Sequence, residues 1–222
     1  MLYNADMLSI IRFMPDNSVD LICTDPPYRT IPGGNKNPAA PRGMLHANDG
    51  KVFKHNDIKI EEYAGELFRV LKDRGHIYLF TNYKNHIHHQ LVLESVGFTL
   101  SNLLIWKKQN ATPSRSHMRN CEYVIFARKG AVKSLNDNGS KTCHEFMNPT
   151  GNKYHPTEKP VDLLQFYIEN STLPGEVVFD PFAGAGSTAL ACMKSGRRFI
   201  GCEIDHDHFN VAKRRISEIS QV

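Results

Sequence analysis

The chain has 222 residues, of which 41% are hydrophobic, and its formal net charge is +4. This length and apolar content can bury one sizeable core, so we expect a single domain over residues 1–222. No apolar run reaches the roughly 18 residues that cross a bilayer and no secretory pattern begins the chain, which argues against a membrane partner and for a cytoplasmic location.

The first strong pattern is an apolar run at residues 19–23, which predicts a buried strand that ends at Asp25, Pro26, Pro27 and Tyr28. This turn suits an amino group on an unstacked base, because the Asp25 carboxylate and the Pro26 carbonyl can accept its two hydrogens and localise its lone pair. A second proline stiffens the turn, and the tyrosine offers an aromatic face. An ordinary turn at the end of a strand is the alternative that these four residues leave open.

Two basic segments point to a polyanionic partner. Residues 29–56 hold five Lys or Arg and one acid between glycines and prolines, which predicts a mobile loop that closes over a target nucleotide and contacts phosphates. A solvated surface loop is the alternative. Residues 107–119 form a second basic segment without an acid, which we expect at the backbone of a nucleic acid.

The middle of the chain alternates between helical and strand patterns. A helix is predicted from about Asp57 to near Gly75, followed by a strand at residues 76–80 and a helix at residues 85–96. Strands are predicted at residues 98–106 and 122–127, with Trp106 in the core. The helix at residues 85–96 contains His86, His88 and His89. These histidines lack an acidic or thiol ligand nearby, so we expect them to be solvated rather than bound to a metal. Helices at residues 157–170 and 205–219 complete a pattern that is typical of a parallel sheet covered on both faces.

A glycine turn follows the apolar run at residues 176–180. Gly184 and Gly186 allow a ligand to approach the first turn of the next helix, where N–H groups are unpaired. A second strand ends at Glu203, a carboxylate placed for ribose hydroxyls. Taken alone, this pattern equally fits a dinucleotide-binding protein, so the glycine turn indicates a nucleotide-like cofactor without naming it. The five cysteines form no Cys-x-x-Cys pair, and we expect free, mostly buried thiols.

Three motifs occur in one order: Asp-Pro-Pro-Tyr at residues 25–28, His-Pro-Thr-Glu-Lys-Pro at residues 155–160, and Asp-Pro-Phe-Ala-Gly-Ala-Gly at residues 180–186. In this respect the chain resembles the S-adenosylmethionine-dependent DNA amino-methyltransferases of the permuted beta group. The resemblance extends from Asp6 to about Glu203. It implies an α/β, Rossmann-like methyltransferase fold with circularly permuted motif order. The sheet would be mostly parallel and seven-stranded, with one antiparallel strand, helices on both faces, and residues 98–106 and 122–127 at its antiparallel edge.

The resemblance also assigns roles to residues. The catalytic residues would be Asp25, Pro26, Pro27 and Tyr28. The cofactor would contact Asp6, Lys159, Pro160, Asp180, Phe182, Ala183, Gly184, Gly186 and Glu203, although a helix N-cap explains Asp6 equally well. Contacts to double-stranded DNA would come from Arg29, Lys36, Arg42, Lys107, Lys108, Arg115 and Arg119. No metal is required, because the sulfonium methyl is already activated.

The resemblance implies the methyl acceptor and the partner proteins less directly. Within the resembled family, an aspartate at the first motif position is usual for the N6 amine of adenine, and Asp25 favours that base over the N4 amine of cytosine. The residues also leave open an RNA or protein amine as acceptor, a non-catalytic DNA-binding relative and a nicotinamide-dependent dehydrogenase. The target-recognition insert at residues 128–154 is short, which suggests a homodimer or a short recognition sequence in the DNA. A cognate restriction endonuclease is a further expected partner.

Overall fold

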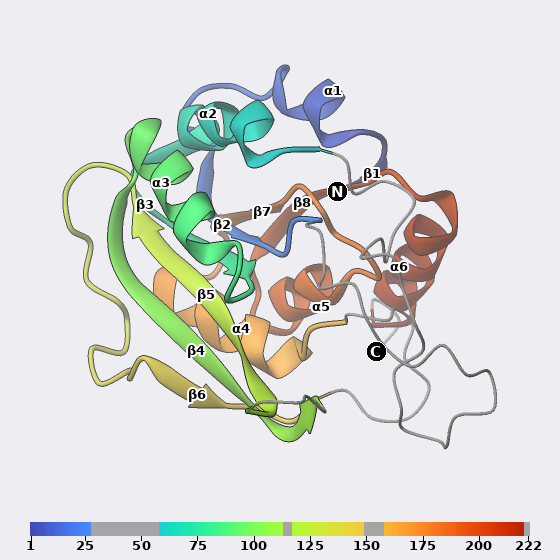
Figure 1. Ribbon diagram of the computed structural model, residues 1–222. Coiled ribbons are helices and arrows are strands. Elements are labelled where there is room, and N and C mark those ends of the chain that lie inside the picture. Colours follow the sequence, from blue (N-terminus) through green and yellow to red (C-terminus); the bar gives the residue numbers. More distant parts are fainter. Residues whose placement is uncertain (28–57, 113–116, 149–157, 220–222) are drawn as a thin grey trace.

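Eight strands form one sheet in the part of the chain that the computed structural model describes, namely residues 1–27, 58–112, 117–148 and 158–219. Their order across the sheet is β1-β8-β7-β2-β3-β5-β4-β6 (Figure 1). The strands are β1 (Leu2–Asn4), β2 (Val19–Thr24), β3 (Leu71–Thr81), β4 (Thr99–Thr112), β5 (Arg119–Arg128), β6 (Cys143–Glu145), β7 (Val177–Asp180) and β8 (Arg198–Glu203). Only β5 runs antiparallel to its neighbours, β3 and β4, within this sheet.

The predicted mostly parallel sheet with one antiparallel strand is confirmed, but the predicted number of seven strands is wrong. The additional strand is β6, which lies inside the segment at residues 128–154 and pairs in parallel with the middle of β4. Three residues are too few to show an alternating pattern in the sequence. Because β6 covers β4, the antiparallel pair of β4 and β5 does not form the edge of the sheet. Trp106 is buried as expected, and its indole N–H donates to the Phe146 carbonyl at 3.0 Å.

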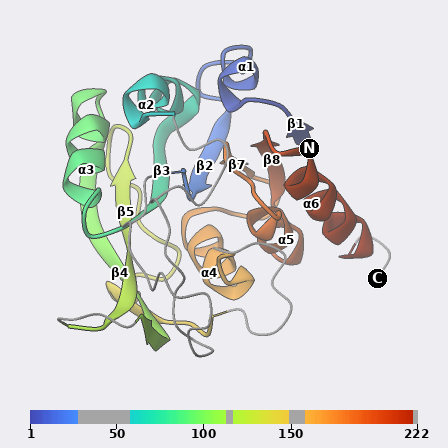
Figure 2. The same cartoon turned by 45° about the vertical axis from the view of Figure 1, so that its right-hand side comes forward.

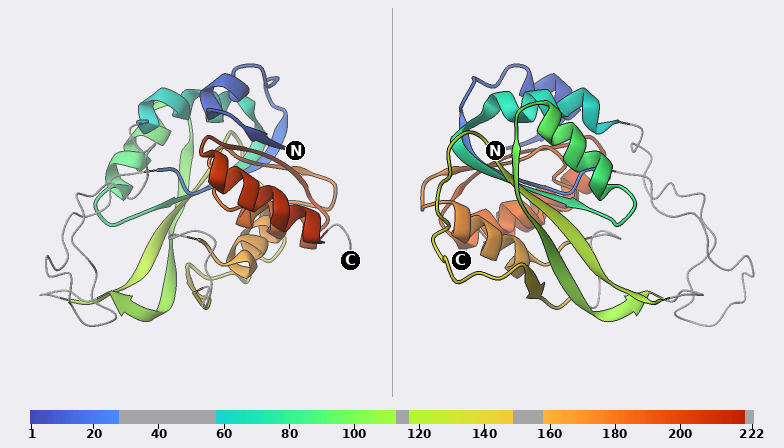
Figure 3. Two further views of the ribbon diagram at one scale, coloured as in Figure 1. Left: turned by 90° about the vertical axis from the view of Figure 1, so that its right-hand side faces the viewer. Right: turned by 60° about the vertical axis from the view of Figure 1, so that its left-hand side comes forward.

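Helices cover both faces of the sheet, as Figures 2 and 3 show. One face carries α1 (Met7–Ile11), α2 (Ile60–Val70) and α3 (His86–Ser95), and the other carries α4 (Val161–Ser171), α5 (Ser187–Lys194) and α6 (His206–Ile219). No helix among the described residues is long and apolar enough to cross a membrane.

Successive residues of the central strands face the two helical layers in turn. Ile22 and Ile77 pack in the core beneath α1, α2 and α3, whereas Leu21, Cys23 and Tyr78 pack in the core above α4 and α5. All six residues of β2 are buried, which explains its nearly continuous apolar sequence. The expected buried thiols are found at Cys23, Cys192 and Cys202.

Two local expectations need correction. The helix predicted from Asp57 to Gly75 is shorter and spans Ile60–Val70, because the residues from Leu71 onward join β3 and pair with β2. His89, which we expected in solvent, is buried, and its Nδ1 lies 3.1 Å from the Thr81 hydroxyl. The described residues contain no cluster of metal-ligating side chains.

Candidate functional site

The candidate site lies where β7 and β2 adjoin. The chain continues from β7 through α5 to β8 on one side, and α2 and β3 follow β2 on the other side. Because α5 and α2 cover opposite faces of the sheet, the carboxyl ends of β7 and β2 flank a topological switch point. Open α/β sheets bind their ligands at this position.

Asp180 joins the two strands at this point. Its Oδ1 accepts a hydrogen bond from the Thr24 hydroxyl at 2.7 Å, and its Oδ2 accepts one from the Thr188 hydroxyl at 2.6 Å. The Phe182 N–H donates to Oδ1 at 3.1 Å. Burial raises the pKa of Asp180 to about 6, although these hydrogen bonds oppose the rise. Asp180 therefore holds the end of β2 against the glycine turn, with both oxygens used inside the protein.

The glycine turn begins directly after Asp180. Its backbone is anchored to β8, because the Ala183 N–H donates to the Cys202 carbonyl at 2.8 Å. Gly184 and Gly186 have φ angles of 52° and 82°, which side chains rarely adopt. Gly186 is also the N-cap of α5, and a Cβ atom there would lie 2.9 Å from the Ala212 Cβ of α6. Both the backbone angle and the close approach of α6 require glycine.

Glu203 ends β8 beside this turn. One carboxylate oxygen accepts the Gly184 N–H at 2.8 Å, and the other accepts the Asp205 N–H at 2.8 Å. Burial raises the pKa of Glu203, and these two N–H groups oppose the rise. A carboxylate oxygen can accept more than one hydrogen bond, so Glu203 keeps acceptor capacity toward the hydroxyls of a nucleoside. This acceptor at the end of β8 fits the predicted cofactor.

Asp25 follows β2 directly and lies next to Lys159 of the second motif. The Lys159 ammonium forms an ion pair with Oδ2 of Asp25. Oδ1 is buried and has no hydrogen-bond partner among the described residues. Burial raises the pKa of Asp25, and Lys159 opposes the rise. A buried acceptor without a donor is costly, so this oxygen is suited to a ligand N–H.

The remaining residues of the two motifs are placed in part. Pro26 is buried and Pro27 is half-buried, whereas Tyr28 lies outside the described residues. Pro160 is buried and is the N-cap residue of α4. Asp6 caps α1, because its carboxylate accepts the Leu8 N–H at 3.0 Å, which confirms the capping interpretation.

The predicted DNA contacts differ in their surroundings. Lys108 points inward, since it forms an ion pair with Glu122 and lies 4.7 Å from the centre of the Trp106 ring. Lys107 is half-exposed and contacts Glu145 at 2.5 Å. The Arg119 guanidinium lies 5.6 Å from the centre of the exposed Tyr83 ring. The other four predicted contacts, Arg29, Lys36, Arg42 and Arg115, lie outside the described residues, as does the predicted loop at residues 29–56.

Sequence reasoning missed two charged residues of the site. Glu122 on β5 lies 3.4 Å from the Lys159 ammonium. Arg215 on α6 donates to the Ala185 carbonyl at 2.7 Å and to Glu158 at 2.6 Å, so it links the glycine turn to the second motif. Glu122 is the only acid between residue 107 and residue 128, and this was the available signal. Arg215 gave none, since basic residues are common on exposed helix faces.

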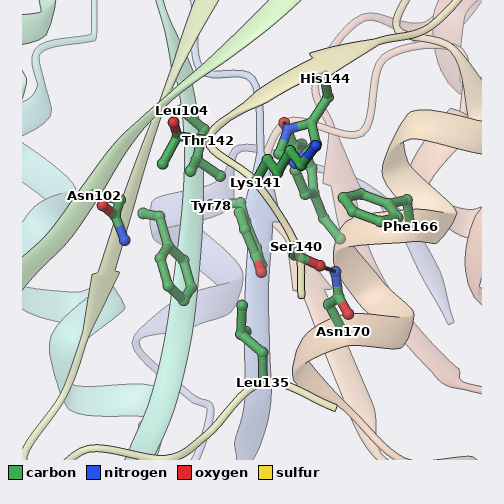
Figure 4. A pocket seen from close by; sticks show the side chains of 12 residues that line it. Tyr78, Asn102, Leu104, Leu135, Ser140, Lys141, Thr142, His144, Phe166 and Asn170 are labelled. Atoms are coloured by element: carbon green, nitrogen blue, oxygen red, sulfur yellow. Dashed lines mark hydrogen bonds between the residues drawn. The ribbon is translucent and has the colours of Figure 1, made fainter. Parts of the chain in front are cut away.

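A small cavity of about 40 Å³ lies elsewhere, between α4 and the strands β3, β4 and β5 (Figure 4). Tyr78, Leu104 and Phe166 line it, together with Ser140 and Asn170, which are joined by a hydrogen bond of 2.8 Å. A cavity of this size has room for water. It contains none of the motif residues and is separate from the candidate site.

A sheet covered on both faces, with a glycine turn and an acidic strand end at its switch point, defines a Rossmann-like protein that binds a nucleotide-like cofactor. The family model N6_N4_Mtase, described as DNA methylase, matches residues 19–214. YubD of Escherichia coli (strain K12) is 30% identical over 221 residues, which cover 98% of this chain and 90% of that protein. The chain belongs to the N6_N4 DNA methylase family.

Two further proteins are similar over nearly the whole chain. The type II methyltransferase M2.MboI of Moraxella bovis is 29% identical over 246 residues, which cover all of this chain and 89% of that protein. The crystal structure of the M1.HpyAVI–SAM complex matches with a TM-score of 0.72 and 26% identity, covering 97% of this chain and 98% of that one.

Proposed function

We propose that the protein transfers the methyl group of S-adenosylmethionine to the exocyclic N6 amino group of adenine, in a base flipped out of double-stranded DNA. The observation that carries this proposal is the hydrogen bond of 2.7 Å between Thr24 and Asp180. This bond joins the end of β2, which leads into the proposed amine-binding turn, to the residue before the glycine turn, although the two residues are 156 positions apart in the sequence. Transfer requires this proximity.

The cofactor would supply an activated methyl group, and the chain would supply position and acceptors. Glu203 would bind ribose hydroxyls, and the backbone from Phe182 to Gly186 would surround the methionine part. Asp25 would accept one amine hydrogen at Oδ1, and the Pro26 carbonyl would accept the other. These contacts hold the nitrogen lone pair in line with the methyl group and exclude water, which together account for most of the acceleration in such reactions.

The choice of adenine rests on Asp25, since the resembled family has aspartate at this position mainly in its adenine members. Methylation of the N4 amine of cytosine is the second candidate, because both amines need the same carboxylate and carbonyl and the family name includes both N6 and N4. We further propose a homodimer and a cognate restriction endonuclease. The endonuclease is supported by the likeness to a type II methyltransferase.

Nucleoside analysis tests the function. Purified protein is incubated with labelled S-adenosylmethionine and unmethylated genomic DNA, and the DNA is then digested to nucleosides. Labelled N6-methyldeoxyadenosine is the expected product. Label in N4-methyldeoxycytidine would overturn the choice of base, and label only in RNA or protein would overturn the DNA acceptor.

Arg215 provides a test of the cofactor site. Replacing Arg215 with glutamine removes the hydrogen bonds to the Ala185 carbonyl and to Glu158, so the glycine turn loses this hydrogen bond from α6 and its link to the second motif. Since hydrogen bonds to charged groups contribute about 1.5–3 kcal/mol, we expect S-adenosylmethionine to bind about 10- to 100-fold more weakly. Isothermal titration measures this, with the exposed Arg214→Gln as the matched control. Equal affinities for the two variants would contradict the assignment.

A further inference from the structure

Four charged side chains of alternating sign form a row that starts at the amine-binding turn. Asp25 contacts Lys159, Lys159 contacts Glu122, and Glu122 contacts Lys108. They come from the end of β2, the segment before α4, β5 and β4. The row therefore connects Asp25 to the antiparallel part of the sheet, which is far from it in sequence.

The row is largely shielded from water. The Lys159 side chain is 8% exposed, and Glu122 and Lys108 are 22% and 23% exposed. The Lys159 ammonium lies 5.3 Å from the centre of the Phe80 ring, and Lys108 lies over Trp106. Buried charges are tolerated only when they are paired, and here two carboxylates balance two ammonium groups.

Glu122 occupies the centre of the row with one oxygen toward each lysine. Its Oε1 pairs with Lys108, and its Oε2 lies 3.4 Å from Lys159 and has no hydrogen-bond partner among the described residues. Burial alone would raise the pKa of Glu122, but the two lysines outweigh it and hold the pKa below its usual value. Glu122 is therefore ionised and competes with Asp25 for the Lys159 ammonium, which lies closer to Asp25.

This attraction matters for Asp25. An ammonium group has three N–H donors and can bridge both oxygens of a carboxylate when it has no other anionic partner. Here Lys159 is shared between two carboxylates and pairs with Oδ2 of Asp25, while Oδ1 is left without a partner in the described part of the chain.

We propose that Glu122 is a positioning residue of the methyl-transfer site: by holding Lys159 it limits the ammonium to Oδ2 of Asp25 and keeps Oδ1 open for the amine hydrogen. This inference rests on the proposed function and adds to it a residue from β5 that none of the three motifs contains. Glu122 does not touch the substrate and acts only through Lys159.

Replacing Glu122 with glutamine tests the inference, since glutamine keeps the size and removes the charge. We expect kcat to fall about 10- to 100-fold, because the acceptor oxygen becomes occupied, while KM for DNA and the affinity for S-adenosylmethionine change less than twofold. The negative charge of Glu122 raises the pKa of Asp25, so its removal should lower that pKa. The acid limb of the profile of kcat against pH should then move to lower pH. Glu122→Asp should recover part of kcat.

The matched control is Glu145→Gln. Glu145 lies on β6 and is the exposed partner of Lys107 on β4, so its replacement should leave kcat unchanged. If Glu122→Gln folds poorly, the double variant Glu122→Gln with Lys108→Gln removes one charge of each sign. It should restore the melting temperature but not kcat.

The results that would contradict the positioning role differ from those that would contradict the proposed function. Unchanged kcat in Glu122→Gln, or recovery of kcat together with stability in the double variant, would overturn the positioning role. A loss of kcat without a shift of the acid limb would mean a structural role only and would also overturn it. Failure of the proposed function itself would appear in the unaltered protein, as an absence of labelled deoxynucleoside.

Discussion

Replacing Asp25 with asparagine is expected to lower kcat by roughly 10²- to 10³-fold, the loss that usually follows removal of one group that stabilises the transition state. The asparagine oxygen would face the Lys159 ammonium, which pairs with Oδ2 in the native protein. Its NH₂ group would then point at the incoming amine, so two donors would meet. Single-turnover methylation with saturating cofactor and DNA measures the loss.

Cofactor affinity in this variant should stay within about twofold, because Glu203 and the glycine turn are unchanged. The matched control is Asp20→Asn near the other end of β2, where the carboxylate pairs with Lys72 at 2.6 Å and accepts the Val177 N–H at 2.9 Å. This control should lower stability and leave kcat intact. An Asp25→Asn enzyme with native kcat would contradict the amine-binding role.

Replacing Gly186 with alanine is expected to damage both stability and cofactor binding. The added Cβ would meet the Ala212 Cβ at 2.9 Å, and the φ angle of 82° disfavours any side chain. Backbone strain of this kind costs about 1–2 kcal/mol and overpacking about 1–3 kcal/mol, so the free energy of unfolding should fall by roughly 2–5 kcal/mol. Displacement of the turn should weaken S-adenosylmethionine binding more than about tenfold. Denaturant unfolding and titration calorimetry measure the two effects.

Gly175 supplies the comparison that separates these causes. Its φ angle is 85°, but nothing lies within 4 Å of a Cβ built there. Gly175→Ala should therefore show the backbone strain alone, about 1–2 kcal/mol, with native cofactor affinity. If both alanine variants bind the cofactor as the unaltered protein does, the close packing of α6 on the glycine turn has no role in the site.

Several elements were predictable because their pattern is local. The apolar run of β2, the apolar face of α2 and the strand, glycine turn and helix around Gly186 each show their structure within a few neighbouring residues. The order of the motifs also indicated the family, which the comparison over residues 19–214 confirms. By contrast, β6 is too short to show a pattern. The residues of β4 with which it pairs are more than 30 positions earlier in the sequence.

The sequence by itself determined the residue types of the candidate site and the strands that end beside it, since parallel strands bring their carboxyl ends to one edge of the sheet. Only the tertiary structure decided which charges meet. Lys159 is 134 residues from Asp25, and Arg215 is 57 residues from Glu158. An ion pair depends on distance in space and on shielding from water. For this reason, neither the ion pairs of Glu122 nor the unpartnered Oδ1 of Asp25 in the described part of the chain could be predicted from a periodic pattern of residues.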